Sequence, residues 1–165
     1  MNKERLYVYD TTLRDGQQTQ GVQFSLAEKH QIAATLDKLG LDYIEGGWPG
    51  ANPVDSDFFD SKPNLRATFT AFGMTKRSGR SAENDDALNG ILNGATPAVC
   101  LVGKSHDFHV ETALEITLAE NTENITRSIE YVVAKDREAL FDAEHFFDGY
   151  KANPTYALET IHAAY

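Results

Sequence analysis

The chain has 165 residues and a formal net charge of −10, from 15 lysines and arginines against 25 aspartates and glutamates. Its length suits one domain with a substantial core, and 41% hydrophobic with 24% charged residues is typical of folded rather than disordered proteins. The excess of acid argues against nucleic acid or an anionic membrane as the partner, because both attract clustered lysine and arginine.

Cys100 is the single cysteine, which excludes an internal disulfide or a cysteine-only metal site and favours a reducing compartment. The first ten residues carry charges and a strand-like alternation where a signal peptide would have an apolar segment. No apolar run approaches the roughly 18 to 20 residues that a membrane helix needs. These features predict a cytoplasmic protein that binds neither nucleic acid nor a membrane.

The chain begins with a β-type run that is followed by a helical pattern. Residues 6–9 are rich in β-forming side chains and predict a first strand. Ser25 and Glu28 fit a capping box that starts a helix, and Gly40 ends it. The apolar side chains expected on the buried face of this helix are Ile32, Leu36 and Leu39.

The same alternation continues to the end of the chain. Strands are predicted at residues 42–45, 67–72, 98–102 and 139–144. Helices are predicted from Pro53, over residues 84–92, within residues 110–133 and from Asn153 onward. The alternation of β and α elements predicts an α/β protein with a parallel sheet and right-handed crossovers.

Two architectures fit this pattern. A doubly wound open sheet would be complete at this length, and periodicity alone slightly favours it. A (β/α)₈ barrel of about 250 residues uses roughly 31 residues per unit, so this chain would hold about five of the eight units. In a barrel, Val99 and Leu101 are expected to face the interior.

The strongest candidate for chemistry is the segment from Asp10 to Gln18, directly after the first predicted strand. Catalytic side chains of α/β proteins gather at the carboxyl ends of strands, so the position is suitable. Arg14 offers a fixed cation for a developing oxyanion, and Asp15 a carboxylate for a hard divalent cation. A surface loop in which these side chains pair with neighbours is an equally weighted interpretation.

Carboxylates also lie at the ends of two other predicted strands. Asp142 and Glu144 are two residues apart in a strand and therefore point to the same side of the sheet. Glu45 ends the second strand. Each is interpreted either as part of a site or as the partner of a cation at a solvated strand end.

Other candidates are weaker. Ser105, His106 and Asp107 are consecutive, so they cannot assemble a catalytic triad. His106 and His109 lack the spacing of the helical metal motif and are expected to face solvent. Cys100 lies in an apolar run and is expected to be a core residue. The sequence has neither a G-x-G-x-x-G nor a Walker A motif, so no dinucleotide or NTP site is predicted.

Two strings, DTTLRDGQQTQGVQFS and YIEGGWPGANP, resemble the DRE-type TIM-barrel metallolyase superfamily. Its members include 2-isopropylmalate synthase, homocitrate synthase, hydroxymethylglutaryl-CoA lyase and citramalate synthase. Residues 46–53, 72–77 and 141–154 are similar to the long-chain bacterial and archaeal (R)-citramalate synthases. The resemblance covers essentially the whole chain and implies a TIM barrel, with about the first five βα units present, in place of the open sheet.

The resemblance implies roles for four residues. Asp15 matches the aspartate that ligates the catalytic divalent metal, and Arg14 matches the arginine beside the substrate carbonyl oxygen. Gln18 matches a substrate-binding glutamine of the same loop, and Glu144 matches a carboxylate at the end of strand five, near the keto acid. Arg14 and Glu144 are therefore expected to act in catalysis, and with Gln18 to bind substrate.

The implied activity is that of an acyltransferase, which condenses acetyl-CoA with pyruvate to give (R)-citramalate and CoA in isoleucine biosynthesis. A bound Mg²⁺, Mn²⁺ or Zn²⁺ would polarise the ketone, and Arg14 would stabilise the alkoxide that forms. Two alternatives are a 2-isopropylmalate synthase, which uses 2-oxoisovalerate in leucine biosynthesis, and a non-catalytic barrel remnant. The resemblance also implies a homodimer.

The sequence departs from the family in what it lacks. The family's two metal-binding histidines lie in an H-x-H motif on strand seven, and the 165 residues contain no H-x-H. The family's G-x-G-E-R segment and regulatory C-terminal domain are also missing. The resemblance therefore implies that residues 1–165 are the N-terminal part of a truncated pyruvate-carboxyltransferase-type barrel domain, with the other metal ligands beyond Tyr165.

Overall fold

The computed structural model describes residues 5–165 and shows an α/β fold. Its strands are β1 (Tyr9–Asp10), β2 (Tyr43–Gly47), β3 (Thr68–Met74), β4 (Ala98–Lys104) and β5 (Glu138–Glu144). Its α-helices are α1 (Leu26–Lys38), α2 (Pro53–Asp60), α3 (Asp86–Asn93), α4 (Asp107–His109), α5 (Leu118–Val133), α6 (Phe146–Ala152) and α7 (Pro154–Ala164). Shorter helical turns are η1 (Gly16–Gln18), η2 (Ala82–Asn84) and η3 (Val110–Leu114). None of the helices in this part of the chain is both long and apolar enough to cross a membrane.

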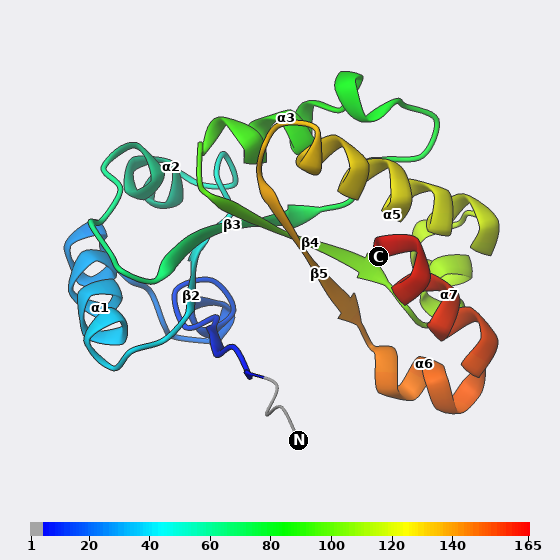
Figure 1. Ribbon diagram of the computed structural model, residues 1–165, viewed down its shortest axis with the longest axis horizontal. Coiled ribbons are helices and arrows are strands. Elements are labelled where there is room, and N and C mark those ends of the chain that lie inside the picture. Colours follow the sequence, from blue (N-terminus) through cyan, green and yellow to red (C-terminus); the bar gives the residue numbers. More distant parts are fainter. Residues whose placement is uncertain (1–4) are drawn as a thin grey trace.

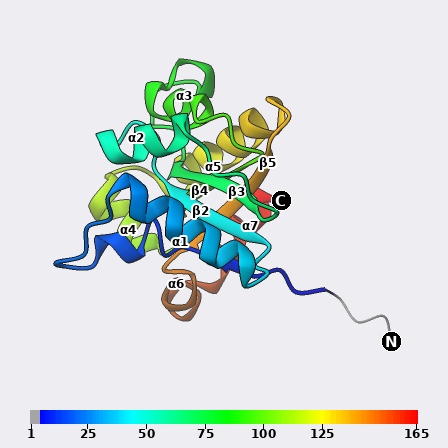
Figure 2. The same ribbon diagram turned by 90° about the vertical axis from the view of Figure 1, so that its left-hand side faces the viewer.

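The described strands are all parallel and pair in sequential order, from β1 to β5. They curl into part of a barrel, with α1, α2, α3 and α5 along its outer side (Figure 1), and Figure 2 shows the same layering from the side. The preference for a doubly wound open sheet is therefore wrong. Such a sheet reverses its strand order at a switch point and carries helices on both faces, whereas each crossover here leads to the next strand along.

The main core lies between the strands and the helices on their outer side. Ile44, Ala71, Val99 and Leu101 project from the strands into this core, where they are almost completely buried. The prediction that Val99 and Leu101 face the barrel interior is wrong. Because successive side chains of a strand alternate between its faces, the interior receives the intervening residues instead, such as Cys100.

A second apolar cluster lines the inner face of the sheet. It consists of Phe72, Cys100 and Val102, with Tyr9, Trp48 and Leu140 packed against it. The Trp48 ring contacts the Phe72 ring edge to face, with a centroid separation of 5.9 Å. Cys100 is buried as predicted, and burial raises the pKa of its thiol to about 12, so it is a neutral core residue.

The start of α1 confirms the predicted capping box. The Ser25 hydroxyl accepts a hydrogen bond from the Glu28 backbone N–H at 3.3 Å, and the Ser25 backbone N–H donates to the Glu28 carboxylate at 2.8 Å. Two amides that the helix leaves free are thus satisfied. Gly40 follows the helix with a φ of 82°, which a side chain would strain.

The buried face of α1 differs from the predicted one. Ile32 and Leu36 pack against the core as expected, but Leu39 is 72% exposed. Lys29 is instead completely buried, because its ammonium group pairs with the Asp55 carboxylate. Hydrophobic periodicity cannot predict a buried lysine whose partner lies on another helix.

Three other elements differ from the sequence prediction. β1 is shorter than predicted, and Leu6 and Tyr7 are exposed. The predicted helical stretch over residues 110–133 is interrupted, because Glu115 adopts a left-handed conformation and the Thr117 side chain caps α5. Helix α6 was not predicted, and it begins after His145, which is also left-handed.

Candidate active site

The carboxyl end of β1 leads into a tight turn that presents Arg14 and Asp15. The Thr11 carbonyl oxygen accepts hydrogen bonds from the backbone N–H groups of residues 14–16, at 3.1, 2.8 and 3.2 Å. Leu13 is completely buried beneath the turn and anchors it. The predicted position after a strand is therefore confirmed, and η1 continues directly from this turn.

Arg14 is held on one side and open on the other. Its Nε donates to the Glu45 carboxylate at 2.6 Å, and its Nη1 donates to the Asp15 carboxylate at 3.2 Å. The guanidinium carbon lies 3.8 Å from the centroid of the Phe72 ring, a cation–π contact. Nη2 has no hydrogen-bond partner among residues 5–165. Every buried side-chain nitrogen or oxygen in this range does have a partner, so Nη2 must be accessible to solvent. The guanidinium therefore has a donor available for a ligand.

Glu45 is the residue that orients Arg14. Its side chain is only 1% exposed, and its second oxygen accepts a hydrogen bond from the Tyr9 hydroxyl at 2.7 Å. Burial raises the pKa of the Glu45 carboxyl, although the hydrogen bonds from Tyr9 and Arg14 act in the opposite direction. Burial also raises the pKa of the Tyr9 hydroxyl, which keeps it a donor to Glu45.

A bulge in β2 follows Glu45. The pairing of β2 with β3 shifts register between Glu45 and Gly47, so Gly46 is an extra residue. A Cβ on Gly46 would lie 2.3 Å from the Phe69 ring, and Gly47 has a φ of 141°, so both positions require glycine. The strand predicted over residues 42–45 therefore extends through Gly47, because these two glycines belong to it.

Asp142 faces the same arginine from β5. Burial raises the pKa of its carboxyl, while the positive charge of Arg14 lowers it and the negative charges of Glu144 and Asp15 raise it further. The structure thus brings the Asp142, Glu45 and Asp15 carboxyl groups into the electrostatic range of one guanidinium. Of the two interpretations that the sequence leaves open, Glu45 is the partner of a cation, Arg14, but its strand end is buried rather than solvated.

Glu144 and Gln18 lie at the same end of the strands as Arg14, but neither of them hydrogen-bonds to it. Glu144 forms an ion pair with Lys104, the residue beside it in the β4–β5 register. Gln18 is exposed on η1, whereas its neighbour Gln17 donates to the Asp55 carboxylate at 3.3 Å. Neither Gln17 nor Lys104 was selected from the sequence, because their partners are distant along the chain.

Asp15 has the chemistry expected of a metal ligand, but the described residues contain no complete site. Its side chain is 62% exposed, and its hydrogen bond to Arg14 occupies one carboxylate oxygen. A carboxylate open to solvent suits a hard divalent cation. Between residues 5 and 165, no group of three or more histidine, cysteine, aspartate or glutamate side chains could hold a metal. Asp15 can therefore supply one ligand only.

Two cavities meet at Trp48 at the carboxyl ends of the strands. One has a volume of about 520 Å³ and is lined in part by Arg14, Gln18 and Trp48. The other has a volume of about 440 Å³ and is lined in part by Trp48, Lys104 and Glu144. The candidate site residues thus border two adjoining spaces.

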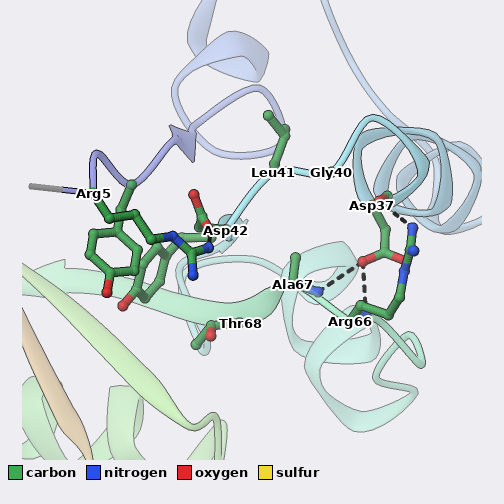
Figure 3. A pocket seen from close by; sticks show the side chains of 10 residues that line it. Arg5, Asp37, Gly40, Leu41, Asp42, Arg66, Ala67 and Thr68 are labelled. Atoms are coloured by element: carbon green, nitrogen blue, oxygen red, sulfur yellow. Dashed lines mark hydrogen bonds and ion pairs between the residues drawn. The ribbon is translucent and has the colours of Figure 1, made fainter. Parts of the chain in front are cut away.

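A further cavity, of about 350 Å³, lies near the amino ends of β2 and β3 (Figure 3). Arg5 pairs with Asp42 on its wall. The Asp37 carboxylate accepts hydrogen bonds from the backbone N–H groups of Arg66 and Ala67, both at 2.8 Å. These contacts join α1 to the segment before β3, so this end of the sheet serves stability, as is usual for that face of a barrel.

His106 and His109 are partly buried, which corrects the prediction that they face solvent. The His109 ring stacks on His145, with centroids 4.4 Å apart, and His106 contacts His109 edge to face. Burial and the neighbouring His145 lower the pKa of His109. Ser105 does not join His106 and Asp107 in a triad, because its completely buried hydroxyl accepts a hydrogen bond from the Thr160 hydroxyl at 2.8 Å.

Comparison with known proteins extends these observations. Residues 5–165 match the family model described as HMGL-like. The (R)-citramalate synthase of Aquifex aeolicus is 50% identical over 164 residues, which cover 98% of this chain and 31% of that protein. The 2-isopropylmalate synthase of Listeria innocua is 30% identical over 161 residues, which cover 98% of this chain and 30% of that protein. The chain therefore spans less than a third of the length of either relative.

The fold of this chain is also found among solved structures. The hydroxymethylglutaryl-CoA lyase from Pseudomonas aeruginosa aligns with a TM-score of 0.61 at 17% identity. The alignment covers 83% of this chain and 44% of that structure. This similarity agrees with a partial TIM barrel, in which the strands described here follow one another around the wall.

Proposed function

Because this chain belongs to the HMGL-like family, we propose that residues 1–165 are the N-terminal part of a (β/α)₈ catalytic domain that condenses acetyl-CoA with pyruvate. Water then hydrolyses the citramalyl-CoA thioester, and the products are (R)-citramalate and CoA. The observation that carries the proposal is the open Nη2 of Arg14, beside the exposed carboxylate of Asp15 at the end of β1. The 50% identity to an (R)-citramalate synthase favours pyruvate as the acceptor over 2-oxoisovalerate.

Arg14 has the geometry to stabilise the charge that develops in this reaction. The acceptor ketone becomes an alkoxide when the enolate carbon of acetyl-CoA bonds to its carbonyl carbon. The open edge of Arg14 donates a hydrogen bond to that oxygen. Glu45 and Phe72 already hold the guanidinium in place, so little reorganisation is needed as the charge develops.

Asp15 would hold the divalent cation that the family uses, together with ligands from residues beyond Tyr165. When bound, the metal supplies Lewis acidity toward the acceptor ketone. Asp15 suits this role because its carboxylate is exposed and, among residues 5–165, has Arg14 as its one hydrogen-bond partner. Asp15 contributes its charge at the same end of the strands as Arg14.

Gln18 and Glu144 would bind the substrates from the two cavities beside Trp48. Gln18 borders the cavity that contains Arg14, and Glu144 borders the neighbouring one. The wall around Glu144 also carries the cations Lys76, Arg77 and Lys104. This excess of positive charge favours an anionic acceptor such as a 2-oxo acid.

A substrate comparison tests the proposed reaction. The full-length protein is expected to show a kcat/KM for pyruvate about 10- to 200-fold above that for 2-oxoisovalerate, because an extra branched group in an apolar pocket is worth only about 1–3 kcal/mol. CoA release is measured with each acid and in direct competition, and a reaction without acid controls for thioester hydrolysis. A higher value for 2-oxoisovalerate would assign the protein as a 2-isopropylmalate synthase. Condensation with neither acid would reject the acyltransferase.

Residues 1–165 expressed alone are expected to release no CoA and to bind Mn²⁺ or Zn²⁺ only weakly. Asp15 alone cannot hold a cation that normally takes at least three protein ligands. The sheet also leaves β1 and β5 as open edges, whose unpaired backbone groups favour association. Calorimetry, a CoA-release assay and size-exclusion chromatography measure these properties, with the full-length protein, proposed to be a homodimer, as the control. A monodisperse, active monomer with micromolar metal affinity would contradict the prediction.

A further inference from the structure

We propose that Lys29 and Asp55 are positioning residues for Arg14. Their buried ion pair holds the bulge of β2, and the bulge in turn sets the position of Glu45, which binds Arg14. The inference concerns the reaction proposed above and rests on that function. It assigns a role to two buried charged residues: Lys29 lines neither cavity, and Asp55 borders the cavity that contains Arg14 without hydrogen-bonding to Arg14.

Lys29 makes contacts that an apolar residue could not replace. Its side chain is completely buried on α1, and its ammonium group donates to the Gly46 carbonyl oxygen at 2.9 Å and pairs with the Asp55 carboxylate. The ammonium also lies 5.4 Å from the centroid of the Phe58 ring. A buried ion pair is often no more stabilising than apolar residues of the same volume, so stability alone does not account for it.

Asp55 connects the bulge to the loop that carries Arg14. One carboxylate oxygen accepts a hydrogen bond from the Trp48 backbone N–H at 3.1 Å, and the other accepts from the Gln17 side chain at 3.3 Å. The carboxylate packs directly on Gly47, where a Cβ would lie 2.7 Å from it. Asp55 thus contacts both the end of β2 and η1.

The path from the ion pair to the site is short. Gly46, whose carbonyl Lys29 binds, is the extra residue of the bulge, and it directly follows Glu45. A change at the bulge would shift the alternation of β2 and therefore the direction of the Glu45 side chain. If the Glu45 side chain turned away, its 2.6 Å contact with Arg14 would be lost. No other carboxylate on β2 pairs with Arg14 and could replace it.

The informative variant combines Lys29→Met with Asp55→Asn. Each single substitution leaves an unpaired buried charge and is expected to lower Tm, whereas the double variant removes both charges and should recover most of that loss. The amide of the double variant keeps one acceptor oxygen where the carboxylate has two, and the Gly46 carbonyl loses its ammonium donor. The matched control is Arg127→Met with Glu130→Gln, an exposed ion pair on α5.

Two measurements are made on these variants. In the 165-residue chain, Trp48 is the single tryptophan, so its emission maximum and its quenching by acrylamide report on the end of β2. In the full-length protein, kcat for citramalate formation is measured with and without Glu45→Gln. The double variant is expected to shift Trp48 emission to longer wavelength and to lower kcat about 10- to 100-fold, as displacements of about 1 Å can do. Adding Glu45→Gln should cause little further loss, because both changes act through the same contact.

The outcomes separate positioning from a purely structural role. Unchanged Trp48 emission in the double variant, or losses of kcat that multiply with Glu45→Gln, would overturn the proposal. If the wild-type full-length protein forms no citramalate, the proposed function is rejected, and the Trp48 measurement alone decides whether the ion pair sets the end of β2. The surface control should leave both measurements at wild-type values.

Discussion

Asp15→Asn is expected to reduce turnover of the full-length protein by about 10³-fold or more, because a metal ligand contributes several kcal/mol of transition-state stabilisation. The fold should stay intact, since the Asp15 side chain is 62% exposed and, among residues 5–165, hydrogen-bonds only to Arg14. Steady-state kinetics after metal removal and titration with Mn²⁺ measure the first effect, and thermal unfolding measures the second. Asparagine keeps the size and removes the charge, so the substitution tests the carboxylate itself.

The control for this variant is Asp86→Asn, a carboxylate that is 96% exposed on α3 and far from the turn in sequence. It should retain wild-type turnover and metal affinity. Near wild-type citramalate formation by Asp15→Asn after EDTA treatment would show that Asp15 is not a metal ligand. Loss of turnover with unchanged metal affinity would place Asp15 in another role.

Arg14→Ala is expected to lower kcat by about 10²- to 10³-fold, the usual effect of removing one donor to a developing oxyanion. Metal affinity should change much less, because the proposed partner of Arg14 is the substrate oxygen. The structure also shows a second consequence, since alanine would leave the buried carboxyl of Glu45 without its cation. A fall in stability could then be mistaken for a loss of catalysis.

Combining Arg14→Ala with Glu45→Gln separates the two effects. The double variant removes the unpaired charge, and its Tm should recover relative to Arg14→Ala because an unpaired buried charge is strongly destabilising. Its kcat should stay as low as that of Arg14→Ala. Recovery of kcat together with Tm would show that the arginine serves stability, and wild-type kcat in Arg14→Ala would remove it from the mechanism.

The sequence alone determined the features that local patterns encode. The alternation of strand and helix, the capping box at Ser25 and Glu28, and the position of Arg14 and Asp15 after the first strand all depend on neighbouring residues. Long motifs added the family and hence the barrel, which periodicity had ranked second. Each of these inferences uses residues that lie close together in the chain.

Only the tertiary structure decided which groups meet at the site. Arg14 and Glu45 are separated by 31 residues and Lys29 and Asp55 by 26, so no local period could pair them. The bulge in β2 depends on the close approach of Phe69 to Gly46, a contact between two strands. The side of the sheet on which Val99 lies and the burial of Lys29 likewise depend on the elements that pack against these residues. Hydrophobic periodicity describes one element at a time, whereas burial and charge pairing depend on elements that only the fold brings together.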